Sequence, residues 1–397
     1  MTPSFTSPKA AERDEAKGSP EIAAALRCWA TDVALPLWAT TGFDAARGGF
    51  HERLHLNGTP DHDAPRRTRV QARQIYVFAH AAVLGWYPEG LGVALRAFEF
   101  MLERRRAPDG ARGYVRVLTP DGTVADASRD LYDHAFILLA LGWLARATGD
   151  AQIAALIDEI LAFLDEDLAA GDGTFHEGIP RTEPRRQNPH MHLFEVMLGL
   201  HQTIGHPEAL TRAAGLRNLL VNTFLDAQTH TLRENFTEDW RPSPGEDGDL
   251  REPGHHAEWV WLIRTHERLT DQPPDPLART LLDQATATAE PGTGFLVDET
   301  DSAGQVRRGN RRLWPQTELA KAWLAECEIG RTGAANEASR TLTNLAAHYL
   351  AGPKPGLWFD QFDANGRPLS QLVPASTLYH LFGAIAEADR VLRASKP

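Results

Sequence analysis

Cysteine is scarce in this sequence. The two cysteines, Cys28 and Cys327, lie far apart, each within a stretch of helical character. Isolated thiols of this kind provide neither a disulfide framework nor a thiolate metal site. The scarcity fits a reducing compartment, and we expect the protein to be cytoplasmic.

Long apolar runs are also missing. No eighteen consecutive residues are apolar, so the sequence predicts no membrane-spanning helix. The N-terminal stretch MTPSFTSPKAAERDEAKGSP lacks the cationic and then apolar order of a signal peptide. We expect residues 1–19 to form a disordered polar tail and residues 20–397 to form one catalytic domain.

The sequence has fewer basic than acidic residues. It contains 41 Lys and Arg residues and 53 Asp and Glu residues, which gives a formal net charge of −12. Such a surface repels nucleic acid and anionic membranes at long range. We therefore expect neither of these partners. A small neutral ligand is favoured instead.

A segment marked by glycine and aromatic residues recurs about every sixty residues. Asn57-Gly58, Asp121-Gly122 and Asn365-Gly366 favour tight turns, so we expect each segment to form a short two-stranded ribbon. The fourth copy is the weakest. The six copies are GGFHERLHLNGTP from Gly48, GYVRVLTPDGTV from Gly113, GTFHEGIPRTEP from Gly173, TLRENFTEDWRP from Thr231, GFLVDETDSAGQV from Gly294 and GLWFDQFDANGRP from Gly356.

Two helical stretches lie between successive ribbons, which gives six pairs of helices. We therefore predict an all-α fold, an (α/α)6 barrel of twelve helices with short β-hairpins at the active-site end. The expected helices cover residues 20–39, 66–87, 91–106, 128–148, 150–169, 190–204, 207–226, 253–270, 275–289, 314–329, 333–350 and 374–393.

The two helices of a pair differ in pattern. Residues 150–169 carry an apolar stripe that includes Ile153 and Ile157, with acidic residues opposite, as expected of an outer helix. Residues 128–148 contain AFILLALGWLA, which is apolar on nearly every side, as expected of an inner helix. We expect the even-numbered helices to line the barrel axis.

The even-numbered helices also share a start signal, a proline at or beside the first turn. We expect all of them to begin at the same end of the barrel, with Asn188 as one N-cap. The prolines are Pro65, Pro189, Pro253, Pro315 and Pro374.

Polar residues occupy the starts of all six inner helices. The intervals from 73 to 134, 192, 255, 316 and 380 are 61, 58, 63, 61 and 64 residues. Side chains at matching positions of inward helices should converge on one pocket. The candidates are Arg73, Gln74, Tyr132, His134, Asn188, His192, His255, Glu258, Trp314, Gln316, Tyr379 and His380.

Some of these residues also have a structural interpretation. His134 could be a hydrogen-bonded core residue, Arg73 a structural cation, and Tyr132 and Trp314 core aromatics. The recurrent spacing argues for function at the other histidines, because a core has no evident need for histidines at equivalent points of successive repeats.

Three alternatives to histidine chemistry remain. A metal could bind His255 and Glu258, which are three residues apart, but neither HExxH nor a cysteine pair is present, so we expect no metal and no cofactor. Glycoside hydrolysis normally requires two opposed carboxylates, and only Glu258 is in register. A pure binding protein is the third alternative.

Histidine suits proton transfer on sugar carbons, because its ordinary pKa of about 6.5 lets it accept and donate a proton near neutral pH. Two histidines on opposite sides of C1 and C2 of an open-chain aldose could pass a proton through a cis-enediol. An arginine would stabilise the enediolate oxygen.

The motifs VQARQ, QNPHMHLFE, PGHHAEW, WPQTE and LYH, in this order, resemble those of the N-acylglucosamine 2-epimerase superfamily. This superfamily includes N-acetylglucosamine and cellobiose 2-epimerases, mannose isomerases and sulfoquinovose isomerases. The resemblance implies an (α/α)6 barrel and cofactor-independent proton transfer through an enediolate. TRVQARQIYVF, EPGHHAEWVW and STLYHLF look most like the mannose isomerase branch, which implies a D-mannose and D-fructose isomerase that also accepts D-lyxose.

The resemblance also implies individual roles. His255 and His380 match the catalytic histidine pair, with Glu258 beside the first, and Arg73 matches the substrate arginine. A second substrate arginine could be Arg251 or Arg241. The resemblance implies substrate contacts at Asn188, His192 and Trp314, and the recurrent spacing adds Tyr132, His134 and Gln316 as expected substrate contacts.

Isomerase and 2-epimerase share these motifs, so the sequence leaves that choice open. We expect a monomer or homodimer acting on a monosaccharide. The arginine cluster Arg66, Arg67 and Arg69 keeps a phosphorylated sugar as an option.

Overall fold

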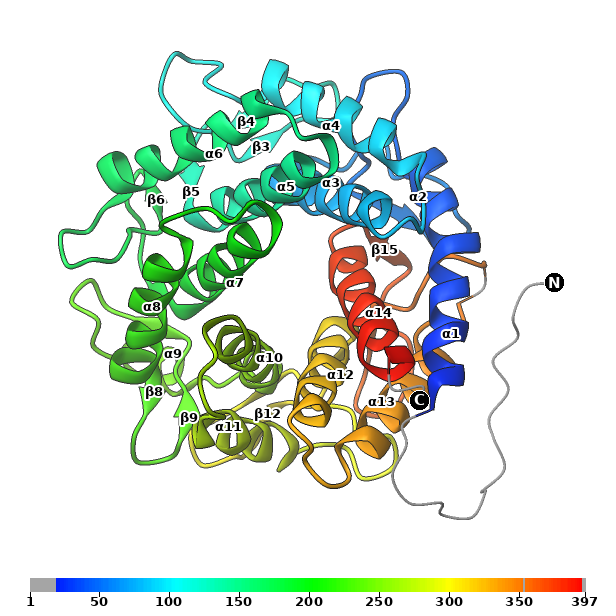
Figure 1. Ribbon diagram of the computed structural model, residues 1–397, viewed down its shortest axis with the longest axis vertical. Coiled ribbons are helices and arrows are strands. Elements are labelled where there is room, and N and C mark those ends of the chain that lie inside the picture. The colour runs from blue at the N-terminus through cyan, green and yellow to red at the C-terminus, as the bar shows by residue number, and fades with distance from the viewer. Residues whose placement is uncertain (1–18, 353, 395–397) are drawn as a thin grey trace.

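The structure, a computed structural model, describes residues 19–352 and 354–394, so the tail expected over residues 1–19 lies almost entirely outside the described residues. Helices form two concentric rings, and the predicted (α/α)6 barrel is confirmed (Figure 1). The inner ring consists of α3 (Thr68–Val83), α5 (Leu131–Thr148), α7 (Gln187–Ile204), α10 (Pro253–Thr270), α12 (Leu313–Glu328) and α14 (Thr377–Ala394).

The outer ring packs around the inner one, and three of its members contain a π-helical turn. A single-turn helix, α9 (Glu246–Asp249), stands apart from both rings. The outer helices are α1 (Pro20–Trp29), which continues through a π turn over Ala30–Ala34 into α2 (Leu35–Thr40), α4 (Gly90–Arg104), α6 (Ala151–Phe163) with a π turn over Leu164–Leu168, α8 (Ala209–Leu219) with a π turn over Leu220–Phe224, α11 (Pro276–Thr286) and α13 (Ala334–His348).

The apolar pattern of each ring explains its position. Helix α6 buries one stripe that includes Ile153, Ile157 and Ile160, whereas α5 is buried on nearly every side. Helix α7 begins one residue before Asn188, with Arg186 at the N-cap, so the prediction of Asn188 as N-cap is wrong. Among the described helices, none is both long and apolar enough to cross a membrane.

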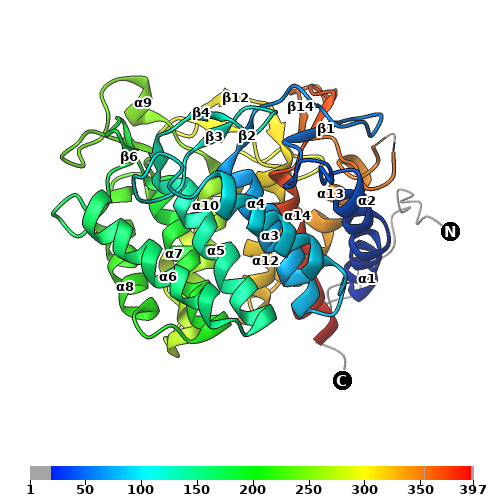
Figure 2. The ribbon, with the colours of Figure 1, turned by 90° about the horizontal axis from the view of Figure 1, so that it is seen from above.

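Short strands interlock the repeats at one end of the barrel (Figure 2). The strand before an inner helix pairs with the hairpin of the next repeat, so the ribbons are not independent of one another as the sequence had suggested. The antiparallel pairs are β2 (Arg66–Arg67) with β3 (Val117–Leu118), β5 (Arg129–Asp130) with β6 (Gly178–Ile179), β7 (Arg185–Arg186) with β10 (Asn235–Phe236), and β13 (Arg311–Arg312) with β14 (Gln361–Phe362).

Two further pairings close this arrangement into a ring. A bridge joins Arg251 to Thr300, and β15 (Leu372–Pro374) pairs with β1 (Arg53–His55), which connects the last repeat to the first. Local hairpins of the predicted kind also occur. They are β3 with β4 (Val124–Asp126), β8 (Leu225–Asp226) with β9 (Thr231–Leu232), and β11 (Glu299–Thr300) with β12 (Val306–Arg308).

Candidate active site

A pocket of about 190 Å³ lies on the barrel axis at the hairpin end. Its walls come from the first two turns of the inner helices and from the residues just before them. Eight of the ten residues that the sequence suggested for catalysis and substrate contact are brought together here. The lining residues are Arg73, Tyr132, Asn188, His192, Glu252, His255, Glu258, Arg312, Trp314 and His380.

Trp314 lies against both histidines of the candidate pair. The centre of its ring system is 5.0 Å from that of His255 and 5.7 Å from that of His380. Gly254 permits this arrangement, because a Cβ atom there would approach the indole to 2.6 Å. The indole thus forms an apolar wall between two titratable rings.

His255 is surrounded by carboxylates. Its Nδ1 lies 2.9 Å from Oε2 of Glu234, an oxygen that also accepts a hydrogen bond from Nε2 of Gln187. Burial lowers the pKa of His255, but the charges of Glu234 and Glu252 outweigh burial and raise it to about 9. His255 is therefore an imidazolium at neutral pH, with Nδ1–H donating to Glu234.

His380 is neutral, in contrast to the protonated His255. Burial lowers its pKa well below the ordinary value, and the nearby cations Arg73 and Lys321 lower it further. Its Nδ1 lies 2.8 Å from Oε1 of Glu318, whose other oxygen forms an ion pair with Lys321. This arrangement keeps the proton on Nδ1 and leaves Nε2 of a neutral ring as an acceptor.

Arg73 is positioned by aromatic rings. Its guanidinium lies 4.1 Å from the centre of the Phe136 ring and donates a hydrogen bond of 2.7 Å to the Tyr132 hydroxyl. Nε of Arg73 and Oδ1 of Asn188 are buried without a hydrogen-bond partner among the described residues. Because unpaired buried polar atoms are costly, both are well suited to bind a polar ligand.

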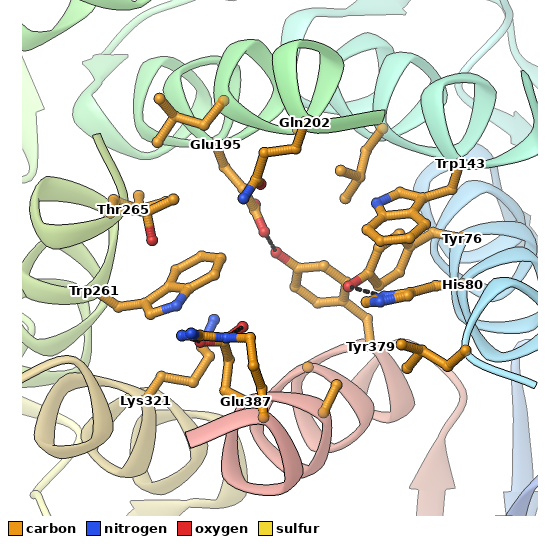
Figure 3. Close-up of a pocket in the computed structure, with 18 of the residues that line it drawn as sticks. Tyr76, His80, Trp143, Glu195, Gln202, Trp261, Thr265, Lys321, Tyr379 and Glu387 are labelled. Carbon is orange, nitrogen blue, oxygen red and sulfur yellow. Dashed lines mark hydrogen bonds and ion pairs between the residues drawn. The ribbon is translucent and has the colours of Figure 1, made fainter. Parts of the chain in front are cut away.

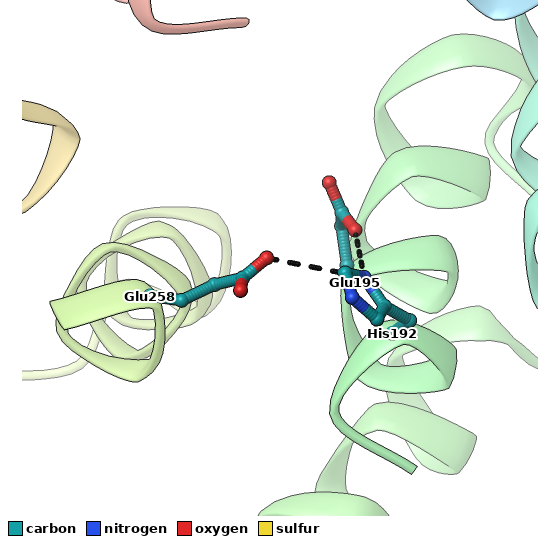
Figure 4. Close-up of side chains that lie close together, drawn as sticks. All are labelled: His192, Glu195 and Glu258. Atoms are coloured by element: carbon teal, nitrogen blue, oxygen red, sulfur yellow. Dashed lines mark hydrogen bonds and ion pairs between the residues drawn. The ribbon is translucent and has the colours of Figure 1, made fainter. Parts of the chain in front are cut away.

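Glu258 is a buried residue of the pocket wall, with His192 and Glu195 opposite (Figure 4). Burial and the charge of Glu318 raise its pKa well above the ordinary value. His192 instead contacts Glu195, with 2.8 Å between Nδ1 and Oε2. Tyr379 donates its hydroxyl hydrogen to the other oxygen of Glu195, which fixes that carboxylate.

His134 and Gln316 lie outside the pocket, so the expectation that they contact the substrate does not fit their positions. Nε2 of His134 accepts from the Tyr114 N–H at 3.0 Å, and Nδ1 donates to the Asp130 carbonyl at 2.7 Å. Gln316 likewise binds both the N–H and the carbonyl of Leu296. Both ends of each side chain are occupied by backbone.

These two residues belong to a set that we call the backbone clamps. In five repeats, the fourth residue of the inner helix is a His or Gln that accepts a hydrogen bond from a backbone N–H of the preceding hairpin segment. The recurrence of polar residues thus has a structural cause, and His134 is the hydrogen-bonded core residue of its structural interpretation. The remaining clamps are Gln71 on Phe50, His190 on Phe175 and His256 on Leu232.

Neither of the two arginines suggested as a second substrate arginine lines the pocket. Arg251 is buried against Asp226, and Arg241 is exposed. Arg312 lines the pocket instead, 5.4 Å from the centre of the Trp314 ring, and pairs with Glu252. Sequence reasoning missed Arg312 and Glu252 as pocket residues, although Glu252 begins the motif EPGHHAEWVW and Arg312 lies two residues before the motif WPQTE.

The arginine cluster of Arg66, Arg67 and Arg69 is paired with carboxylates, and none of the three lines the pocket. Arg66 pairs with Asp44, and Arg67 pairs with Glu52. The third member, Arg69, pairs with the buried Asp133 at 3.0 Å. No member of the cluster is left with an uncompensated charge.

A second cavity lies further along the axis, among the later turns of the inner helices (Figure 3). Trp143 stacks on His80 with 3.5 Å between ring centres, and Nζ of Lys321 lies 3.9 Å from the centre of the Trp261 ring. Glu195, Tyr379 and Lys321 line this cavity, and Glu195 also contacts His192 of the first pocket. These side chains therefore form part of the wall between the two cavities.

Known proteins resemble the chain over most of its length. The family described as N-acylglucosamine 2-epimerase (GlcNAc 2-epimerase) matches residues 48–384. A protein of Rhizobium meliloti named mannose-6-phosphate isomerase is 35% identical over 378 residues, which cover 93% of this chain and 97% of that protein. D-mannose isomerase of Thermobifida fusca is 27% identical over 346 residues, with 79% and 82% covered.

A solved structure supports the fold independently. Cellobiose 2-epimerase from Spirochaeta thermophila matches with a TM-score of 0.83 at 23% sequence identity, covering 94% of this chain and 97% of that one. At this identity, the likeness concerns the fold alone.

Proposed function

Because the chain belongs to the N-acylglucosamine 2-epimerase family, we propose that it is an aldose–ketose isomerase that interconverts D-mannose and D-fructose, and D-lyxose and D-xylulose, without a metal ion. The relatives support a sugar isomerase or epimerase as the general class. What we propose beyond this class is mannose as the substrate and the roles of individual residues.

This proposal rests on the different protonation states of His255 and His380. Two chemically identical side chains touch the same indole, yet carboxylates keep one protonated, whereas burial and cations keep the other neutral. A pair of groups whose environments separate their pKa values supplies an acid and a base at the same pH. Proton transfer between neighbouring carbons requires such a pair.

In the proposed reaction, Nε2 of His380 removes the proton from C2 of the open-chain aldose. The C2–H electrons form the C1–C2 double bond, and the carbonyl electrons move to O1, where His255 donates a proton. The resulting enediol loses the O2 proton to His255, and His380 returns its proton to C1. The ketose forms, and both histidines regain their first charge state. Arg73 stabilises the developing oxyanion.

A free sugar fits the pocket better than a sugar phosphate does. The Arg66, Arg67 and Arg69 cluster is already paired with carboxylates, and Arg312 pairs with Glu252 inside the pocket. A phosphate dianion that bound any of these four arginines would have to displace its carboxylate partner. The name of the Rhizobium meliloti relative states mannose 6-phosphate as its substrate. Our proposal of a free sugar as substrate therefore differs from what that name would suggest.

A product assay tests the proposal. Purified protein is incubated in EDTA with mannose, lyxose, glucose or N-acetylglucosamine, and with mannose 6-phosphate, and the products are separated. We expect fructose from mannose and xylulose from lyxose, with mannose 6-phosphate a much poorer substrate. Loss of all activity in EDTA would contradict the metal-free mechanism.

A 2-epimerase is the second candidate, and the same pair of histidines favours it. If the proton of His255 were delivered to C2 from the face opposite His380, the product would be the C2 epimer. Glucose formed from mannose, with no fructose, would identify this reaction. In D2O the position of the label in the product separates the two outcomes, because epimerisation places solvent deuterium at C2 of glucose, whereas isomerisation places any incorporated deuterium at C1 of fructose.

A further inference from the structure

Three ligand-type side chains meet in the wall between the two cavities. One nitrogen or oxygen atom each of His192, Glu195 and Glu258 lies within 4.8 Å of the others. Nδ1 of His192 is 2.8 Å from Glu195 and 3.9 Å from Oε1 of Glu258. All three side chains are at least nine-tenths buried. In Figure 4 the Glu258 carboxylate points towards the other two.

Glu258 supplies a second, independent observation. Its side chain is 1% exposed, and its Oε1 atom has no hydrogen-bond partner among the described residues. A buried carboxylate oxygen without a donor is expensive unless the group is protonated or binds a cation. This unpartnered oxygen is the one that lies nearest to His192.

We propose that His192, Glu195 and Glu258 bind one divalent transition-metal ion of the zinc type, and that this ion inhibits the enzyme rather than serving it. Imidazole nitrogen and carboxylate oxygen are both zinc ligands, and three protein ligands leave a further position for water. The ring proton of His192 would move to Nε2, which frees Nδ1 for the metal.

Two other groups of similar composition are less suited to a metal ion. Glu234, Glu252 and His255 include a protonated imidazole, and Arg312 pairs with Glu252. The group of Glu258, Glu318 and His380 contains the Lys321 ammonium, which forms an ion pair with Glu318. A resident cation repels a metal ion from each of these groups.

The His192 group differs from both. Among the described residues, neither Glu195 nor Glu258 forms an ion pair with an arginine or a lysine; both contact only His192 in this way. Lys321 and Arg73 act on the group at longer range. This is the one group of the three in which, among the described residues, no lysine, arginine or protonated histidine forms an ion pair with a ligand side chain.

Inhibition follows from the position of the ion. His192 and Glu258 line the proposed substrate pocket, so an ion held between them would occupy groups that face the sugar. We expect competition between metal and mannose. Binding of the ion does not depend on the proposed reaction, whereas this inhibition does.

Cobalt is the best probe, because Co2+ in a zinc-type site absorbs visible light. The full chain is freed of metal with EDTA, dialysed and titrated with Co2+. We expect a visible band that saturates at one ion per chain and disappears when Zn2+ is added. E195Q and E258Q should each weaken Co2+ binding by at least about tenfold.

E252Q is the matched control, because it removes a carboxylate of the same pocket without touching the three ligands, and it should leave Co2+ affinity unchanged. Thermal unfolding of each variant checks the fold; if E195Q does not fold, E258Q decides. The proposal is overturned if no saturable binding occurs at millimolar Co2+, or if E195Q and E258Q bind as wild type does, or if E252Q loses binding equally.

An activity assay with Zn2+ separates this inference from the proposed function. If the protein does not isomerise sugars but still binds one Co2+ through these residues, only the proposed function fails. If it isomerises mannose and Zn2+ neither binds nor inhibits, only the metal site fails.

Discussion

His255 and His380 illustrate how the same side chain acquires two charge states. Each Nδ1 faces a carboxylate, Glu234 in one case and Glu318 in the other. The difference is that Lys321 is paired with Glu318, whereas Glu252 adds a second negative charge near His255. Groups one contact away from the reacting rings therefore determine which ring holds the proton.

The proposed acid role of His255 makes activity fall at alkaline pH. His255 must be protonated, so kcat/KM should decline as the pH rises through its pKa of about 9. Glu234→Gln removes the principal charge that raises this pKa, and the decline should move down by about one to three pH units. The pH profile of kcat/KM for mannose measures this shift.

Glu252→Gln serves as the comparison for that profile, because Glu252 acts on His255 only through space. We expect a smaller shift than for Glu234→Gln. An alkaline limb that is identical in wild type and Glu234→Gln would show that His255 is not the titrating acid.

The charge of Arg73 should contribute to the rate of the reaction. Arg73→Met keeps most of the apolar stem but removes the charge aimed at the oxyanion, so kcat should fall by about 10²–10³-fold. Tyr132→Phe removes only the hydroxyl that accepts from Arg73 and should cost less. If Arg73→Met retained near-normal kcat with an unchanged melting temperature, Arg73 would have no role in the reaction.

At the scale of the helix, phase separates the clamps from three residues of the pocket. The clamps lie at the fourth residue of an inner helix, whereas Arg73, His192 and Glu258 lie at the sixth. A step of two residues turns a side chain by about 200° around the helix, which places it on the other face. Residues close in sequence thus serve hairpin attachment and the pocket separately.

This phase difference explains what sequence reasoning could predict and what it could not. Inner helices, their common start and the pocket itself follow from apolar pattern and prolines. The intervals of 58 to 64 residues vary by more than the two residues that separate clamp from pocket, so spacing alone misassigned His134 and Gln316. Glu234 and Glu318 were missed because their partners lie 21 and 62 residues away and meet them only in the folded chain.

His134 allows the clamp interpretation to be tested. Its pKa is lowered to about 4 by burial. The unfolded chain takes up this proton below about pH 6.5, whereas the folded chain resists it until about pH 4, so the stabilisation is complete above pH 6.5 and is lost as the pH falls through this window. His134→Gln, which imitates two natural clamps, should fold and keep kcat/KM.

Urea unfolding at two pH values provides the measurement. Between about pH 7.5 and 5, wild type should lose about 1–2 kcal/mol more stability than His134→Gln, because only the imidazole titrates. His134→Leu leaves the Tyr114 N–H and the Asp130 carbonyl unpaired and should cost about 1–3 kcal/mol at either pH. A large loss of kcat/KM in a stable His134→Gln would restore the substrate-contact hypothesis.

At the scale of the whole molecule, the strands form a closed ring. Helix α1 packs beside α14, where Arg27 pairs with Asp389, so the described ends of the chain lie close together (Figure 1). The β1–β15 pair joins the first repeat to the last. The sequence predicted six units but not this interlocking, because pairing between repeats leaves no local pattern.

A circular permutant tests the closed ring. A flexible linker joins residue 394 to residue 20, and new ends are opened at the exposed turn between Asp121 and Gly122. Strand pairing connects every repeat to the next around the ring, so no particular repeat has to hold the chain ends. This permutant should therefore fold with the wild-type helix content and retain activity. Opening the chain within α7, between Leu198 and Gly199, is the control and should prevent folding. An unfolded Asp121 permutant would show that the natural ends matter.

The β1–β15 pair also limits how such a protein can change in size. An open solenoid gains or loses a unit at its end, since each unit contacts only its neighbours. A closed ring has no end to extend, and a seventh unit would force every inner helix apart. The diameter of the barrel therefore stays constant. Larger or smaller sugars must be accommodated by changes in the length and composition of the hairpins around the pocket.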